Sequence, residues 1–152
     1  MSAVFKKLNL KDQTEILVLN APSSFESELA ALKRVTILRT EHKARAITFS
    51  LAFVTQQEEI DTLAKTIARK ATGDAVVWFA YPKGTSKRFK SAIDMDTGWT
   101  PLGEAGFESV RRVAIDEDWS AKRFRRVESI KSMTRERGWA MTSQGKKKAR
   151  RN

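Results

Sequence analysis

The pattern of apolar and polar positions is organised around seven uncharged residues, Ala75 to Tyr81, which end at Pro82. A continuous apolar run of this length, rich in β-branched and aromatic side chains, predicts a strand that is buried on both faces. The residues before it have helical spacing from Ile60 to Ala71, and Gly73 stands where a left-handed helix cap is expected. A helix followed by a doubly buried strand predicts an α/β sheet.

Three apolar runs in the first half of the chain predict three more strands, over residues 14–19, 35–38 and 44–54. The third run has the clearest alternation of large and small side chains. Its small residues are expected on one face, where a helix can approach closely, and its large residues on the other. The large residues are Ile47, Phe49, Leu51 and Phe53.

Two capping-box spacings predict helix starts in this half, at Ser23 to Glu26 and at Thr55 to Glu58. The first helix is expected to end near Lys33 and Arg34, because cations favour a helix C-terminus. A strand, a helix and a strand of this size form a βαβ unit, in which the two strands run parallel.

The second half predicts a short helix that starts at Thr100-Pro101 and ends at Gly106. Residues 108–115 and 119–127 predict an antiparallel hairpin, and residues 128–139 predict a helix or a docked extension.

Together these elements predict an α/β fold, a three-layer sandwich with five or six mostly parallel strands and an antiparallel C-terminal hairpin at one edge. The expected strand order is 2-1-3-4-6-5, with the topological switch point between strands one and three. Residues 1–140 are expected to form a single domain, and residues 141–152 a basic disordered tail.

The composition is that of a globular protein and excludes several kinds of chemistry. The chain has 152 residues, of which 41% are hydrophobic and 31% charged, and no cysteine. The lack of cysteine excludes disulfides, thiolate metal sites and cysteine nucleophiles. No apolar run approaches the roughly 20 residues of a membrane span, and the N-terminus does not have the pattern of a secretory signal. We therefore expect a cytoplasmic protein with no membrane partner.

The turn after the first predicted strand argues against a nucleotide cofactor. It reads Asn20-Ala-Pro-Ser-Ser24, and the first glycine of the chain is Gly73. Sites for dinucleotides or S-adenosylmethionine need glycines in this turn, because the backbone must approach the ligand closely. We therefore expect no cofactor.

The sequence offers no evident catalytic or metal-binding set. His42 is the only histidine and lies in a charged loop, whereas triad catalysis requires a histidine held by buried partners. Asp94 and Asp96 have the spacing of cation ligands, but such pairs are more often turn formers, and the same holds for Asp116 and Asp118. We expect neither a catalytic residue nor a metal.

Two groups of residues at the carboxyl ends of the predicted strands are candidate binding sites, because ligands of α/β sheets bind there. The first is the loop after the doubly buried strand, whose side chains can hold a phosphate or another anion: Lys83, Thr85, Ser86, Lys87, Arg88 and Lys90. The second is a pocket formed by Asn20, Ser23, Ser24, Thr55 and Tyr81. The alternatives are a solvated loop for the first group and ordinary helix capping for the second.

The charge distribution allows a nucleic acid as a partner. The net charge is +11, and five of these charges lie in the tail at Lys146, Lys147, Lys148, Arg150 and Arg151. Such a tail adds salt-sensitive affinity for any polyanion, or it confers solubility. The hairpin interleaves Trp119 and Phe124 with basic residues, a pattern that can bind single strands or can describe a strand with one buried face. These basic residues are Arg111, Arg112, Lys122, Arg123, Arg125 and Arg126.

Several segments resemble a family of small bacterial proteins known only as a domain of unknown function. The resemblance spans roughly residues 14–135 and lies in residues 20–25, 77–87, 98–107, 113–121 and 123–125. Its most specific parts are Tyr-Pro-Lys and Ile-Asp-Glu-Asp-Trp-Ser, and it implies no activity or catalytic residue. The order of elements is also similar to the later part of class I methyltransferases, which implies a Rossmann-like, methyltransferase-like fold without the glycine motif.

From these observations we expect a non-catalytic α/β domain that binds an anionic ligand or a macromolecular partner, either a nucleic acid or a protein. The alternative is a divergent methyltransferase-like enzyme that has a cofactor site of another design, in a pocket near Asn20, Thr55 and Tyr81.

Overall fold

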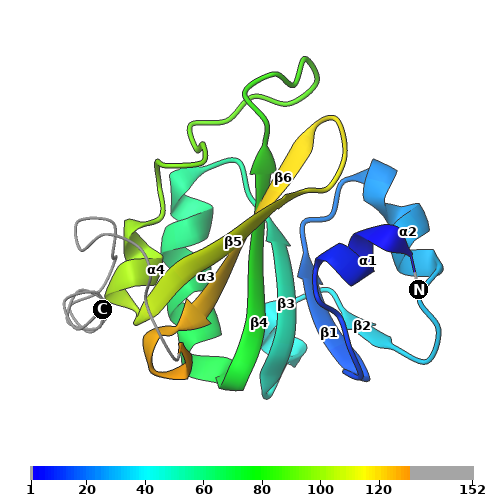
Figure 1. Ribbon diagram of the computed structural model, residues 1–152, viewed down its shortest axis with the longest axis vertical. Coiled ribbons are helices and arrows are strands. Elements are labelled where there is room, and N and C mark those ends of the chain that lie inside the picture. The colour runs from blue at the N-terminus through cyan, green and yellow to red at the C-terminus, as the bar shows by residue number, and fades with distance from the viewer. Residues whose placement is uncertain (1, 131–152) are drawn as a thin grey trace.

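A six-stranded sheet lies between two layers of helices in the computed structural model, which describes residues 2–130 (Figure 1). The strands are β1 (Glu15–Leu19), β2 (Thr36–Leu38), β3 (Ile47–Phe53), β4 (Ala71–Pro82), β5 (Phe107–Ala114) and β6 (Trp119–Arg126). The helices are α1 (Ala3–Lys7) and α2 (Glu26–Ala30) on one face, and α3 (Gln57–Lys70) and α4 (Thr100–Glu104) on the other. Short 3-10 helices are η1 (Ser23–Phe25), η2 (Glu41–Lys43) and η3 (Val127–Ser129). The predicted three-layer α/β sandwich is confirmed.

The strand order is β2-β1-β3-β4-β6-β5, which is the order predicted from the sequence. β1 pairs in parallel with β2 and with β3, and β3 pairs in parallel with β4. β6 is antiparallel to β4 and to β5, so the C-terminal hairpin forms the edge of the sheet. In this order β1 has β2 on one side and β3 on the other, so the switch point lies between β1 and β3.

β4 is buried on both faces, as its apolar run predicts. Val77, Phe79 and Tyr81 pack in the core beneath α3 and α4, whereas Val76 and Trp78 pack in the core beneath α1 and α2. The indole N–H of Trp78 is the polar exception, and it donates to the backbone carbonyl of Leu8 at 2.7 Å. A buried donor needs such a partner, so this bond fixes the N-terminal segment against the centre of the sheet.

The junction of α3 and β4 differs from the prediction. The helix ends at Lys70, and Ala71 is already extended, so Gly73 is not the helix cap. Gly73 has the expected left-handed backbone, with φ +58°, but it lies in an irregular part of β4, where pairing passes from Ile47↔Ala71 to Phe49↔Val76. Because of this irregularity Ile47 packs beneath α3, on the opposite face from the other large residues of β3.

The helix starts also differ from the two predicted capping boxes. At the first, the chain enters a 3-10 turn after Pro22 without a side-chain cap, and α2 ends at Ala30, short of Lys33. At the second, the box is displaced by one residue to Gln56 and Glu59. α4 starts at Thr100, with Trp99 rather than Thr100 as its N-cap residue.

The hairpin of β5 and β6 confirms the extended segments predicted on either side of residues 116–118. The predicted extension over residues 128–139 lies outside the described residues from residue 131 onward, as does the whole of the predicted tail. Within residues 2–130, no helix is long and apolar enough to cross a membrane.

Alanine at Gly98 is expected to destabilise the protein by about 1–3 kcal/mol, because left-handed backbone is costly for other residues. Gly98 has φ +106°, and an added Cβ would lie 3.0 Å from Gln57 Oε1. The matched control is alanine at Gly84, where a Cβ meets nothing within 4 Å and the effect should stay within about 0.5 kcal/mol. Urea unfolding measures both, and equal midpoints for the two variants would contradict this account.

Candidate functional site at the carboxyl ends of the strands

Two cavities lie at the carboxyl ends of the strands, the side of an α/β sheet where ligands bind. The acidic cavity, of about 440 Å³, is lined by Leu19, Asn20, Arg39, Thr40, Glu41, Glu58, Glu59, Thr62 and Leu63. The loop cavity, of about 590 Å³, is lined by Tyr81, Pro82, Lys83, Gly84, Thr85, Asp94, Met95, Arg112, Val113, Ala114 and Ser120. The first follows β1 and β2, and the second follows β4 and β5.

The turn after β1 does not have the open backbone that a nucleotide needs. Asn20 adopts φ +58°, and its side-chain amide donates to the carbonyl of Phe53 and to Glu59 Oε2, both at 3.3 Å. These bonds join the ends of β1 and β3 across the switch point, where a glycine would leave space. Pro22, which follows, has no N–H to offer. The glycine-dependent mode of binding S-adenosylmethionine therefore does not fit these residues.

The N-terminus of α2 is also unsuited to an anion. α2 has only five residues, and its first turn carries Glu26 and Glu28. Ser23 and Ser24 are exposed in η1, and neither caps the helix. Carboxylates at a helix N-terminus already interact with the positive end of the helix dipole, and their negative charge repels a second anion.

The acidic cavity has an excess of carboxylates. Glu41, Glu58 and Glu59 line it, and Arg39 is the one basic residue among the lining residues. The guanidinium of Arg39 is held by Glu26 through two hydrogen bonds of 2.8 and 2.9 Å. These bonds hold the pKa of Glu26 below its ordinary value. Glu59 accepts the backbone N–H groups of Thr55 and Gln56, at 2.9 and 3.0 Å, and so fixes the start of α3 at the cavity wall.

The predicted pocket at the strand ends is divided between the two cavities. Asn20 lines the acidic cavity and Tyr81 lines the loop cavity, whereas Ser23, Ser24 and Thr55 line neither. The carbonyl of Thr55 accepts a hydrogen bond of 2.9 Å from the hydroxyl of Ser91. Thr55 thus anchors the segment that leads to α4.

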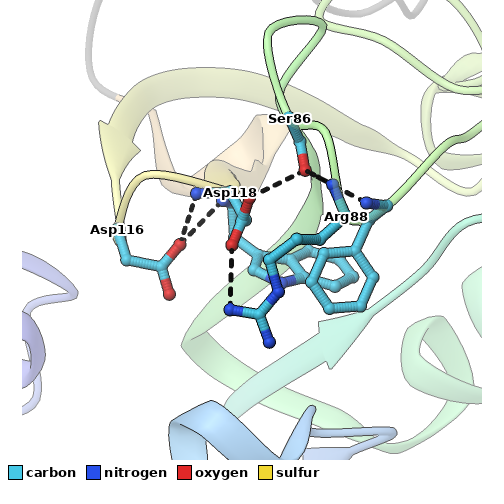
Figure 2. A network of polar contacts seen from close by, with 6 residues as sticks. Ser86, Arg88, Asp116 and Asp118 are labelled. Atoms are coloured by element: carbon cyan, nitrogen blue, oxygen red, sulfur yellow. Dashed lines mark hydrogen bonds and ion pairs between the residues drawn. The ribbon is translucent and has the colours of Figure 1, made fainter.

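The basic loop, residues 83–90, already holds a carboxylate of the protein itself. Figure 2 shows Asp118 between Ser86 and Arg88. The hydroxyl of Ser86 donates to Asp118 Oδ1 at 2.8 Å, and Arg88 Nη1 lies 3.7 Å from Asp118 Oδ2. The backbone N–H of Lys83 donates to the carbonyl of Asp118 at 2.8 Å. We call these contacts the Asp118 network.

Asp116 prepares the position of Asp118 in this network. Its Oδ1 accepts the backbone N–H groups of Asp118 and Trp119, at 2.8 and 2.9 Å (Figure 2). This is the turn-forming role expected of such a residue. Asp118 is therefore held at the hairpin tip by Asp116 on one side and by the basic loop on the other, and it is only 7% exposed.

The residues predicted to bind an anion consequently separate into three groups. Lys83 and Thr85 line the loop cavity, and Ser86 and Arg88 belong to the Asp118 network. The remaining two residues of the prediction are exposed and line neither cavity: Lys87 and Lys90. An external anion would have to displace a fixed carboxylate to reach Ser86 and Arg88.

Ser120 of the loop cavity is a residue that the sequence analysis missed, and Arg112, which also lines this cavity, was considered there only as a basic residue of the hairpin. Ser120 lies opposite Tyr81 in the β4–β6 pairing, and Ala114 lies opposite Ser120 in the hairpin. Tyr81 is only 3% exposed, and burial is the main reason that its pKa is raised. Its hydroxyl is therefore protonated at neutral pH. The predicted hairpin could have placed Ser120 opposite Ala114, but its length does not set the register of β6 against β4, which brings Ser120 beside Tyr81.

The basic and aromatic residues of the hairpin do not form a stacking surface. Trp119 and Phe124 are buried in the two cores, on opposite faces of the sheet. Arg125 forms an ion pair of 2.6 Å with Asp74, and Arg126 donates to the carbonyls of Ala68 and Ala71. Both arginines hold the hairpin against the α3–β4 junction.

His42 and Asp94, two other polar residues considered in the sequence analysis, lie in a charged loop and in a turn, respectively. The side chain of His42 is 88% exposed, 3.8 Å from Glu41 Oε1. Asp94 accepts the backbone N–H groups of Asp96 and Thr97, at 2.9 and 2.8 Å, and these bonds lower its pKa. In residues 2–130 no three side chains of His, Cys, Asp or Glu gather as a metal site.

Solved structures with a similar fold include methyltransferases. A SAM-dependent methyltransferase from Aquifex aeolicus has a TM-score of 0.56 and 14% identity over 80% of this chain and 87% of its own. The N-methyltransferase NodS from Bradyrhizobium japonicum has a TM-score of 0.52 and 14% identity over 80% of this chain and 91% of its own. No protein-family model and no curated protein sequence matches this chain. The likeness defines a methyltransferase-like fold with a mixed six-stranded sheet.

Replacing Asp118 with alanine is expected to destabilise the protein by about 1–3 kcal/mol, because the hydroxyl of Ser86 and the charge of Arg88 lose their buried acceptor. The matched control is Glu117→Ala, an exposed carboxylate of the same turn. Urea unfolding gives both values. A similar loss in the two variants would mean that the turn, and not the Asp118 network, carries the effect.

The ion pair of Glu26 and Arg39 is expected to add stability above the ordinary carboxyl pKa and to lose it as the pH falls through the lowered pKa of Glu26. An NMR titration of the Glu26 carboxyl measures this pKa directly. It should rise towards its ordinary value in Arg39→Gln and stay lowered in Lys33→Gln, which removes an exposed cation outside the pair. An unchanged pKa in Arg39→Gln would contradict the assignment.

Proposed function

We propose that this chain is a divergent methyltransferase-like protein that binds an adenosyl ligand in the acidic cavity, without a glycine-rich turn. The fold supports the class of ligand, because the similar structures include SAM-dependent enzymes. The position supports it too, because the cavity follows β1 and β2 beside the switch point. Its volume of about 440 Å³ is in the ordinary range for small-ligand sites.

Glu41 is the observation that carries the proposal. It follows β2 and lines the same cavity as Asn20, the first residue after β1, and 41 minus 20 gives a spacing of 21 residues. Dinucleotide-binding folds place an acidic residue about 20 residues after the first turn, where it accepts hydrogen bonds from the ribose. In this account Glu41 binds the ribose hydroxyls, although the first turn itself is built differently.

The charge of the cavity favours one kind of adenosyl ligand. Carboxylates outnumber the single arginine, and that arginine is held by Glu26. S-adenosylmethionine carries a sulfonium and an ammonium charge against a single carboxylate, and this net positive charge suits such a wall, whereas a triphosphate would be repelled. Because residues 20–24 do not form the usual cradle, we derive no methyl-transfer step for this protein.

A second candidate is a non-catalytic domain that binds a macromolecular polyanion. The exposure of Lys87 and Lys90, whose loop neighbours bind Asp118, favours it.

We also propose that the chain belongs to the small bacterial family of unknown function. In support, its Tyr-Pro-Lys segment pairs with its Asp-Trp-Ser segment, through Tyr81↔Ser120 and Pro82↔Trp119.

Calorimetric titration of the full chain with S-adenosylmethionine, adenosine and ATP tests the first proposal. S-adenosylmethionine should bind, and ATP should bind more weakly or not at all. Glu41→Gln should weaken binding roughly 10–100-fold, the loss expected for a hydrogen bond to a charged group. Glu104→Gln, which removes an exposed carboxylate on α4, is the matched control and should leave the affinity unchanged.

Two results would overturn the proposal: no binding of any adenosyl ligand, or binding that Glu41→Gln leaves intact. A short oligonucleotide in the same series tests the second candidate. Its binding should be salt-sensitive and should fall in a Lys87→Glu/Lys90→Glu variant.

A further inference from the structure

We propose that the loop cavity is a binding site for a small organic anion, separate from the acidic cavity. Its walls come from four parts of the chain that meet only in the fold: the end of β4, the basic loop, residues 94–95, and the β5–β6 hairpin. With about 590 Å³ it is large enough for a small ligand.

Two cations face this cavity with no partner of their own. Among residues 2–130, neither the ammonium of Lys83 nor the guanidinium of Arg112 takes part in a hydrogen bond or ion pair. The neighbouring basic residues differ, since Arg88 has Asp118 and Lys122 donates to the carbonyl of Met95. Lys83 and Arg112 are therefore two cations of the cavity lining that can bind an anion without breaking a hydrogen bond or ion pair within residues 2–130.

Hydroxyl groups at the base of the cavity complete the set of donors. Tyr81 and Ser120 face each other across the β4–β6 pairing, and Thr85 comes from the loop. Burial is the main reason that the pKa of Tyr81 is raised, so its hydroxyl keeps its proton. The Tyr81 hydroxyl is hydrogen-bonded to the side chain of Ser120, and one O–H of this pair is left to donate to a ligand. A carboxylate or phosphate group seated here would accept from one arginine, one lysine and neutral hydroxyls, a combination that favours an anion.

The apolar side chains of the remaining lining favour an organic anion over an inorganic one. Pro82, Met95, Val113 and Ala114 supply apolar surface, and Met95 is 40% exposed. The one carboxylate of the lining, Asp94, has an oxygen bound to the N–H groups of Asp96 and Thr97. An apolar body against these side chains keeps the anionic group of the ligand near Arg112 and Lys83.

The Asp118 network defines where this site ends. It holds Ser86 and Arg88 against the hairpin tip, so they do not reach the cavity, and it fixes the loop from which Lys83 and Thr85 do. The same loop thus binds one carboxylate within the protein and presents a second set of donors outward.

NMR titration of the full chain with benzoate and with inorganic phosphate tests the proposal. Benzoate should shift the amide signals of Tyr81, of residues 83–85 and of residues 112–114, and it should bind more tightly than phosphate. Arg112→Gln should weaken benzoate binding at least roughly tenfold, the value of one charge-assisted hydrogen bond. Its matched control is Arg111→Gln, the preceding exposed arginine of β5, which does not line the cavity.

A second pair repeats the comparison within the loop: Lys83→Gln should weaken binding, and Lys87→Gln should not. Each variant removes one positive charge, so an equal loss within either pair would indicate unspecific attraction and overturn the proposal. Tighter binding of phosphate than of benzoate would overturn the organic class. Glu41→Gln should leave benzoate binding unchanged, so the result is independent of the adenosyl proposal.

Discussion

The burial of β4 on both faces is the constraint on which the rest of the structure depends. A strand with Val77, Phe79 and Tyr81 on one side and Val76 and Trp78 on the other must have cover on both. α3 and α4 provide one cover, and α1 and α2 the other (Figure 1). The bond from Trp78 to the carbonyl of Leu8 ties the second cover to the strand. β4 also joins the parallel half of the sheet to the antiparallel hairpin, so its position sets the place of every other strand.

This arrangement explains why one edge of the sheet carries two cavities of different chemistry. β1 and β2 run parallel to β4, so their carboxyl ends open on the same edge, but different loops follow them. The ends of β1 and β2 meet the carboxylates at the start of α3. The end of β4 meets the basic loop and the hairpin. The charge of each cavity is therefore set by loops, while the sheet sets only its position.

The sequence was sufficient for the features that depend on local patterns. The apolar run of β4, the alternation of β3 and the hairpin each follow from neighbouring residues, and the rules of parallel sheets reduce the strand orders that these elements can adopt. It was not sufficient for features set by register between distant segments. The irregular pairing at Gly73, the capture of Ser86 by Asp118, and the meeting of Arg112 with Tyr81 all depend on which residue lies opposite which. The short helix α1 was not predicted, because the apolar residues around it have only weak helical periodicity. Its position depends on a distant residue, Trp78, whose indole N–H donates to the carbonyl of Leu8 just after the helix.

Asn20 closes the turn at the switch point by its backbone conformation and its side-chain bonds. The turn after β1 needs a left-handed residue, and asparagine tolerates this backbone better than most side chains. Unlike glycine, it brings an amide that must find acceptors, and here these are the carbonyl of Phe53 and the carboxylate of Glu59. The bonds hold β1, β3 and α3 together at the point where a glycine turn would admit a ligand. Stability at the switch point and access to it are thus alternatives. In this chain the cavities at the carboxyl ends of the strands lie beside the turn, and neighbouring loops form their walls.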